Sequence, residues 1–123
     1  MADQCKLESM WVMQRKFMEL LQEKRGFSAF PVDLASKEGQ LFVKNISYEC
    51  ADELHEARQH LKCKRHRLTV TGEFDRDAYI EELADAQHYL LEIVIASGIS
   101  IEEFYEAYTK KDEINVLRIS GSY

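Results

Sequence analysis

The segment from Tyr79 to Ala96 restricts the possible folds of this chain more than any other. When its residues are placed at about 100° per step, as in a helix, apolar side chains cover nearly all of its circumference. They are Leu83, Ala84, Leu90, Leu91, Ile93, Val94 and Ile95. A helix that is apolar on nearly all sides belongs in the interior of a bundle or of an oligomer. We therefore expect a buried helix from about Arg76 to Ala96, ended by Gly98.

A stripe of polar side chains interrupts this apolar surface. Its members, at intervals of three, four and three residues, are Glu82, Asp85, Tyr89 and Glu92. Burial of an unpaired carboxylate is costly, so these acids need a positively charged partner. A divalent cation is an efficient partner, because a single ion binds several carboxylate oxygens. Glu82 and Asp85 are therefore predicted to be ligands of Mg²⁺, with Mn²⁺ as an alternative.

A second acidic segment is predicted to form a helix from Ser47, its capping residue, to about Lys62. The acids along the edge of its apolar face, at spacings of four and three, are Glu49, Glu53 and Glu56. Glu53 lies closest to the apolar face. Two such helices packed side by side would gather four or five carboxylates into one metal site. The alternative for this helix alone is a solvated face whose acids pair with Arg58 and Lys62.

Two more helices complete an all-α chain. They are predicted over Lys6–Lys24, ended by Gly26, and over Ile101–Leu117, capped by Ser100. The content of 5 Gly and 1 Pro argues against a turn-rich all-β fold. With 123 residues, 46% of them hydrophobic, the chain is predicted to be one domain, residues 1–123, with a four-helix-bundle-like architecture. Its apolar helices further predict assembly with copies of itself.

The connections between these helices are predicted to be irregular. Residues 27–40, which include Gly39, are expected to form a loop or a short turn of helix. Residues 69–75 are expected to be a loop and residues 119–123 a short tail. The basic run of residues 62–67 is expected to be a solvated connection. It is too short to make a surface for nucleic acid, although it could help to attract a small polyanion such as a triphosphate.

The formal net charge of −6 excludes a general electrostatic attraction to nucleic acid or to an acidic membrane. The three cysteines, an odd number with no C-x-x-C pair, are Cys5, Cys50 and Cys63. This pattern indicates neither a disulfide framework nor a zinc knuckle. The first residues lack an apolar signal core, and the longest apolar stretch, residues 90–96, is far too short to span a bilayer. We therefore expect a cytoplasmic protein without nucleic-acid or membrane partners.

The E-E-L-A-D stretch of residues 81–85 resembles the second signature of the all-α nucleotide pyrophosphohydrolases. This family contains MazG, the dimeric dUTPases and the dCTPases. The pair His88-Tyr89 that follows resembles the dimeric dUTPases, in which His is followed by an aromatic residue. Residues 108–118 are similar to the family's carboxy-terminal element of Lys-Asn-Glu-hydrophobic-Asn and Arg. The resemblance covers roughly residues 46–118.

This resemblance implies a MazG/dUTPase-type fold that assembles as a homodimer or homotetramer. The implied activity is the Mg²⁺-dependent hydrolysis of a nucleoside triphosphate to the monophosphate and pyrophosphate. Glu82 and Asp85 become metal ligands, and Gln14 becomes a base-recognising residue. The implied contacts to substrate or phosphate are Lys111, Asn115 and Arg118. Asp112 stands where the family tends to have Asn, and His88 is expected to be a hydrogen-bonded core residue next to the site.

The chain departs from the family at the first signature, which is an E-x-x-E followed by Leu. Aligned on Glu53, this signature would place its other acid at position 50, where the chain has Cys50. Alternative registers pair Glu53 with Glu56, or Glu49 with Asp52. We expect Glu53 to be a ligand, with Glu49 and Glu56 sharing the remaining role.

As a hypothesis for the mechanism, Glu53 or Glu56 orients or deprotonates the attacking water. Lys111 and Arg118 would offset charge on the phosphates.

The short chain favours a MazG-like enzyme acting on dGTP, whereas the carboxy-terminal element favours one acting on dUTP or dCTP. A compact phage-encoded enzyme that controls nucleotide pools would reconcile the two. A rival from another class is a non-catalytic helical oligomerisation or regulatory module, whose acids pair with basic residues across an interface. Those basic residues would be Arg58, Lys62 and Arg65.

Overall fold

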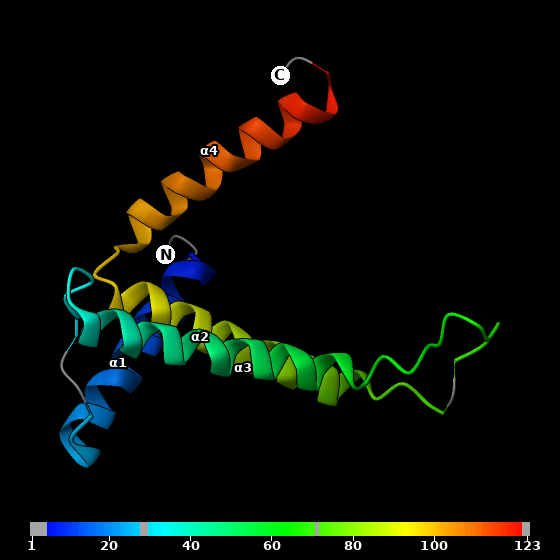
Figure 1. The fold of residues 1–123 in the computed structure, drawn as a ribbon, viewed down its shortest axis with the longest axis horizontal. Coiled ribbons are helices and arrows are strands. Elements are labelled where there is room, and N and C mark those ends of the chain that lie inside the picture. Colours follow the sequence, from blue (N-terminus) through cyan, green and yellow to red (C-terminus); the bar gives the residue numbers. More distant parts are fainter. Residues whose placement is uncertain (1–4, 28–29, 71, 122–123) are drawn as a thin grey trace. The chain divides into compact units, whose positions relative to one another are not determined.

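The computed structural model describes residues 5–27, 30–70 and 72–121, which form four helices and their connections (Figure 1). The helices are α1 (Lys6–Arg25), α2 (Lys37–Arg58), α3 (Arg76–Ala96) and α4 (Ile101–Ile119). No strand occurs within the described ranges, which confirms the predicted all-α class. Three parts of the predicted connections and tail lie outside the described residues, namely 28–29, 71 and 122–123.

The bounds of α1, α3 and α4 confirm the predictions made from local sequence signals. α1 ends where Gly26 adopts a left-handed backbone with φ of 64°. At the start of α3, the N–H of Ala78 donates to the carboxylate of Asp75 at 3.1 Å. At the start of α4, the N–H of Glu103 donates to the hydroxyl of Ser100 at 3.1 Å. Each cap pairs a backbone group that the helix itself leaves without a partner.

The predicted start of α2 at Ser47 is wrong, because the helix already begins at Lys37. Ser36 is its N-cap, and the Ser36 hydroxyl accepts from the N–H of Gly39 at 3.0 Å. Ser47 instead lies inside the helix, where its hydroxyl donates to the carbonyl three residues earlier at 2.6 Å. Residues 37–40, predicted to belong to a loop or to a short turn of helix, are therefore the first turn of α2.

The error at Gly39 has a packing cause. A Cβ atom at this position would overlap the carbonyl oxygen of Asp33, so only glycine lets the first turn of α2 approach the preceding segment this closely. Gly39 therefore permits close packing and does not stop a helix. α2 also ends earlier than predicted, at Arg58 rather than near Lys62, and residues 59–70 and 72–75 belong to an irregular connection to α3.

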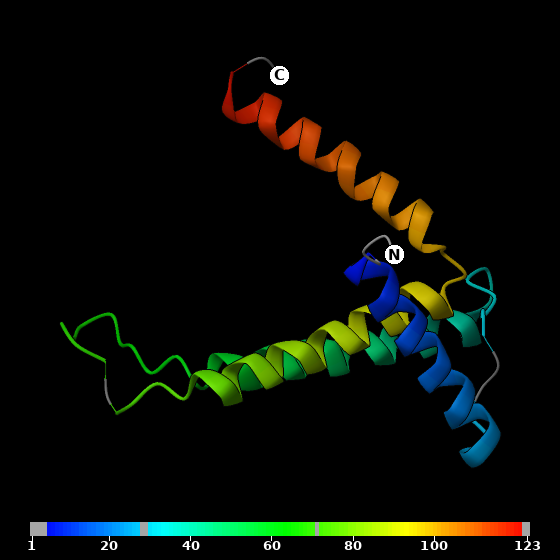
Figure 2. The same cartoon turned by 180° about the vertical axis from the view of Figure 1, so that it is seen from behind.

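The chain divides into two compact units. The hairpin unit comprises Asp33–Ile93, and the terminal unit comprises Met1–Val32 together with Val94–Tyr123. In the hairpin unit, α2 and α3 run side by side in opposite directions, and residues 59–70 and 72–75 extend past their common end (Figures 1 and 2). The hairpin is the part of the molecule that carries the predicted carboxylates.

In the terminal unit, the end of α3 is fixed by the segment that follows α1. The N–H of Val32 donates to the carbonyl of Ala96 at 2.8 Å. Gly98 follows with φ of 76°, which confirms the predicted stop. A Cβ at Gly98 would lie 3.2 Å from the Cβ of Pro31, so this glycine also permits a close approach.

Few side chains are fully buried. Those of the hairpin unit are Ile46, Ala57, Ala86 and Leu91. The predicted burial of α3 is confirmed for Leu91 and for residues 94–96, whereas other large side chains of the same helix stay partly exposed. They are Ile80 at 44%, Leu83 at 39% and Leu90 at 40%. Within one chain, α3 is therefore buried on only part of its apolar circumference.

The corrected start of α2 predicts opposite effects for two serines. Replacing the N-cap in Ser36→Ala should lower the free energy of unfolding by about 1 kcal/mol, because the N–H of Gly39 loses its acceptor. Ser47→Ala is the matched control and should be neutral or slightly stabilising, because Ala favours the interior of a helix. Urea denaturation followed by circular dichroism measures both. A larger loss in Ser47→Ala than in Ser36→Ala would contradict the helix start at Lys37.

Candidate metal centre

Three carboxylates meet between the two helices of the hairpin unit. One oxygen each of Glu53, Glu82 and Asp85 lies within 4.8 Å of the other two. Glu53 comes from α2, while Glu82 and Asp85 share one face of α3 because they are three residues apart. The antiparallel packing of the helices brings the two acidic stripes to the same level. The structure thus brings together three of the five predicted ligands.

Two of these carboxylates are held without compensation. The Oε2 atoms of Glu53 and Glu82 are inaccessible to solvent and have no hydrogen-bond partner. Among the described residues, the charges that act on the pKa of Glu53 and on that of Glu82 are those of neighbouring acids and not of Lys or Arg. Buried anionic oxygens without donors or cations are costly. This donor set fits a hard divalent cation, which would satisfy all three carboxylates together.

Burial and the neighbouring acids raise the pKa of Glu53 and of Glu82. Burial raises the pKa of Glu53 from an ordinary value of 4.5 to about 7. The neighbouring acids that add to this rise are Glu56, Glu82 and Asp85. Burial, followed by the adjacent Glu56, also raises the pKa of Glu82. Without a bound cation, a substantial fraction of Glu53 therefore holds a proton near neutral pH.

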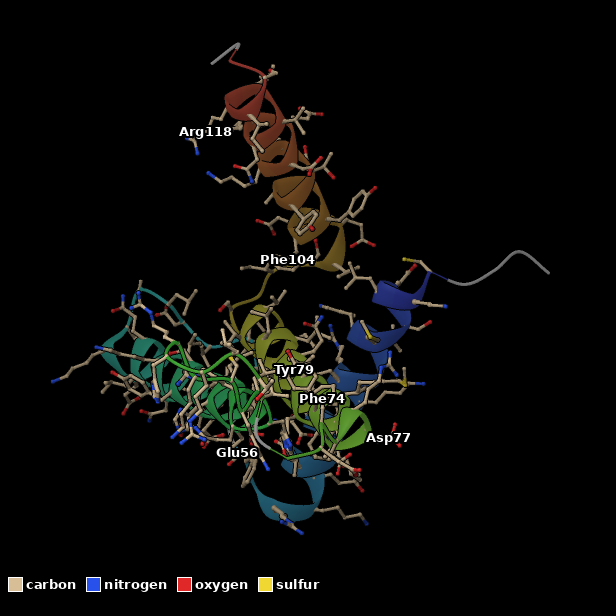
Figure 3. All side chains as sticks on the ribbon, turned by 90° about the vertical axis from the view of Figure 1, so that its right-hand side faces the viewer. Glu56, Phe74, Asp77, Tyr79, Phe104 and Arg118 are labelled. Carbon is tan, nitrogen blue, oxygen red and sulfur yellow. The ribbon has the colours of Figure 1, made fainter. Side chains whose placement is uncertain are left out.

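The remaining predicted ligands, Glu49 and Glu56, have different neighbours in the hairpin. Glu56, marked in Figure 3, is exposed and neighbours both Glu53 and Glu82. Glu49 lies elsewhere on the hairpin, beside Tyr89 and Glu92. Burial and then the carboxylate of Glu49 raise the pKa of Tyr89, and the same two causes raise the pKa of Glu92. Of the alternative registers, the geometry of the hairpin therefore favours Glu53 with Glu56.

Cys50 faces α3 from the position where the family resemblance places an acid. Its thiol donates to the carbonyl of Ala86 at 3.4 Å, and burial raises the pKa of this thiol. The position is thus directed toward α3, as an E-x-x-E register requires. Its side chain, however, is engaged by backbone and adds no carboxylate to the cluster.

The residues implied as substrate contacts belong to the terminal unit, so their contribution to the carboxylate site stays a prediction. Gln14 is buried on α1, with 2% of its surface exposed. The other three lie exposed on α4 at spacings of four and three, and are Lys111, Asn115 and Arg118. Such spacings place them on one face of the helix.

Two further expectations are corrected by the hairpin unit. His88 is exposed to solvent and is not a core residue, because it lies on the outer side of α3. Arg58, considered as a partner for the acids of α2, instead contacts the Nδ1 atom of His55 at 2.6 Å. The sequence placed Tyr89 and Glu92 on the same stripe as Glu82 and Asp85. That Glu49 is their neighbour became clear only from the packing of α2 against α3.

Comparisons with known proteins identify no relative of this chain. No protein-family model, no curated protein and no solved structure matches the chain. A search of the described helices also finds none long and apolar enough to cross a membrane.

The raised pKa of Glu53 predicts a pH dependence of stability. Because this pKa is higher in the folded chain than its ordinary value of 4.5, folding favours the protonated acid, and its contribution to stability falls as pH rises toward about 7. In metal-free buffer with EDTA, Glu53→Gln should therefore gain stability relative to the wild type between pH 5 and pH 8. The neighbouring exposed acid gives the control, since Asp52→Asn should show a difference from wild type that is flat with pH. Urea midpoints across this range test the sign, and a gain at low pH instead of high pH would refute it.

Proposed function

We propose that this chain is a Mg²⁺-dependent nucleoside triphosphate pyrophosphohydrolase that acts on deoxynucleotides. The observation that carries the proposal is the cluster of carboxylates of Glu53, Glu82 and Asp85, in which one oxygen each of Glu53 and Glu82 is buried without a hydrogen-bond partner. Such oxygens are suited to divalent cations, and hydrolysis of a triphosphate is a reaction that such cations serve. The resemblance of residues 81–85 and 108–118 to the all-α pyrophosphohydrolases supports the same reaction.

In this proposal the metal ligands are Glu53, Glu82 and Asp85. Bound Mg²⁺ would neutralise charge on the phosphate oxygens and lower the pKa of a coordinated water. Mn²⁺, which accepts the same oxygen ligands, is the alternative. The three clustered acids would be fully ionised when they hold the cation, because the cation offsets their mutual repulsion.

Glu56 is the better placed of the two candidate bases. Its carboxylate is exposed yet adjacent to Glu53 and Glu82, so it can reach both solvent and the metal site. We assign to Glu56 the orientation of the attacking water and the acceptance of its proton. The water oxygen would bond to the α-phosphorus, the bond from that phosphorus to the bridging oxygen would break, and pyrophosphate would leave. Lys111 and Arg118 would offset charge on the phosphates, and Asn115 and Gln14 would contact the nucleoside.

The activity proposal predicts loss of turnover in variants of α3. In assays of each ribo- and deoxynucleoside triphosphate with Mg²⁺ or Mn²⁺, the wild type should release the monophosphate and pyrophosphate. Glu82→Ala and Asp85→Ala should lose at least about 100-fold in rate, because each removes a ligand. Glu81→Ala is the matched control, since Glu81 is an exposed neighbour of Glu82, and it should retain activity.

A second readout separates metal binding from catalysis. Mg²⁺ should raise the unfolding midpoint of the wild type and of Glu81→Ala, but not that of Glu82→Ala. Retained turnover in Glu82→Ala would sink the assignment of the site. No product from any nucleotide with the wild type would instead favour a helical oligomerisation or regulatory module.

We further propose that the active form is a homodimer or homotetramer. Support comes from large apolar side chains of the hairpin that stay exposed in a single chain, among them Tyr48 at 57% and Leu54 at 51%. Burial of such side chains against a second copy would remove apolar surface from water.

Light scattering after size-exclusion chromatography should therefore give two or four times the chain mass of 14.4 kDa. If the contact between copies is apolar, a salt such as sulfate should strengthen the assembly, because excluded salts favour burial of apolar surface. A mass of 14.4 kDa at all protein concentrations tested would contradict the assembly.

A further inference from the structure

The connection between α2 and α3 concentrates the positive charge of the hairpin unit. We call the described residues of this connection, 59–70 and 72–75, the basic arm. Within the arm, four permanent cations occur among six consecutive residues, and all four are exposed; they are Lys62, Lys64, Arg65 and Arg67. Along the described chain, Lys64, Arg65 and Arg67 form no ion pair with a carboxylate. Their charge is thus available to an external anion.

A turn holds three of these cations close together. The N–H of Arg67 donates to the carbonyl of Lys64 at 3.1 Å, so residues 64–67 form a β-turn with Arg65 inside it. The ends of such a turn approach within about 7 Å of each other between Cα atoms. Three cations on one turn repel each other in water. A polyvalent anion placed among them would relieve this repulsion.

Residues of both limbs of the arm line one hollow near its base. Residues 60–63 and residues 70 and 72–74 line opposite sides of one hollow of about 210 Å³. Phe74 lies edge-on against Tyr79 of α3, with ring centroids 5.4 Å apart (Figure 3). The arm is thus anchored to the hairpin at its base, while its turn is presented to solvent. An irregular connection of this length in a compact chain is typically a functional element.

Charge along the hairpin is segregated. Residues 45–57 of α2 and residues 77–93 of α3 contain no Lys or Arg, whereas all the carboxylates of the candidate metal centre lie there. The arm begins immediately after this acidic part. Lys62 follows Glu56 by six residues, so the chain keeps it within about 20 Å of Glu56. Along the chain of the hairpin unit, Arg58 is the first cation after Glu56, and the arm adds four more cations within the next nine residues.

We propose that the basic arm is a polyphosphate-binding element, in which Lys64, Arg65 and Arg67 hold the phosphate chain of the substrate. This inference rests on the proposed function for the identity of the phosphate chain as part of a nucleotide. Arg binds phosphate oxygens through two parallel N–H donors, and Lys supplies a point charge. The acidic cluster alone would repel a triphosphate. The arm offsets this repulsion from the same end of the hairpin.

Inorganic tripolyphosphate is the probe that tests the arm apart from hydrolysis. Isothermal titration calorimetry of the full chain, in EDTA and at low ionic strength, should detect its binding. The variant Lys64→Gln/Arg65→Gln/Arg67→Gln should bind at least about tenfold more weakly, because three charge-assisted contacts are lost. The control Lys16→Gln/Lys24→Gln/Arg25→Gln removes three exposed charges from α1 and should stay within about twofold of the wild type.

A charge-conserving variant separates binding from structural damage. Lys64→Arg/Arg65→Lys/Arg67→Lys should restore most of the affinity, and circular dichroism should show the same helix content in all variants. Equal affinity of the arm variant and the wild type would overturn the proposal, as would the absence of binding to the wild type. In nucleotide hydrolysis, the arm variant should raise KM about tenfold with little change in kcat. Binding of tripolyphosphate without any hydrolysis by the wild type would refute the proposed function and leave the arm assignment standing.

Discussion

The repulsion among carboxylates enclosed between α2 and α3 is the constraint on which the rest of the hairpin depends. Apolar contacts of Ile46, Ala57 and Leu91 favour close packing of the two helices, and this packing removes oxygens of Glu53 and Glu82 from water. The free energy of apolar burial therefore holds acids together that would separate in an open chain. A cation that binds them would lower the free energy of the folded hairpin. Stability and the proposed metal binding would thus be coupled at one place.

The hairpin separates its acidic cluster from a cluster of cations. Residues 45–57 and 77–93 of its helices contain no Lys or Arg, whereas four cations occur among residues 62–67 of the irregular connection. This separation gives each part a different partner chemistry. Enclosed carboxylates suit a small hard cation, whereas exposed cations on a turn suit a phosphate chain. A metal-bound nucleotide contains both kinds of group, so one ligand could engage both parts of the hairpin.

The side chains of α3 relate this site to assembly. Leu91 and the residues that follow it are buried, but Ile80, Leu83 and Leu90 are not. The exposed residues alternate along the helix with Glu82 and Asp85, the proposed ligands. A partner packed on this helix would therefore also reduce the exposure of the carboxylate cluster to water, which would strengthen its electrostatic interactions.

The sequence by itself determined the features that depend on neighbouring residues. Ser100, Gly26 and Gly98 marked helix ends through local backbone hydrogen bonds and left-handed conformations, and the period of α3 revealed its acidic stripe. Only the tertiary structure decided which acids meet. It placed Glu56 beside Glu53 and Glu82, and Glu49 beside Tyr89 and Glu92.

The same distinction explains the errors. Gly39 lies inside α2 because the first turn of this helix packs against the carbonyl of Asp33. Cys50 stands at the expected acid position and donates to the carbonyl of Ala86. Both contacts join residues that a local pattern does not relate. Helix periodicity gives the face on which a side chain lies. The level at which two faces meet is set by packing between helices far apart in the chain, which no local pattern contains.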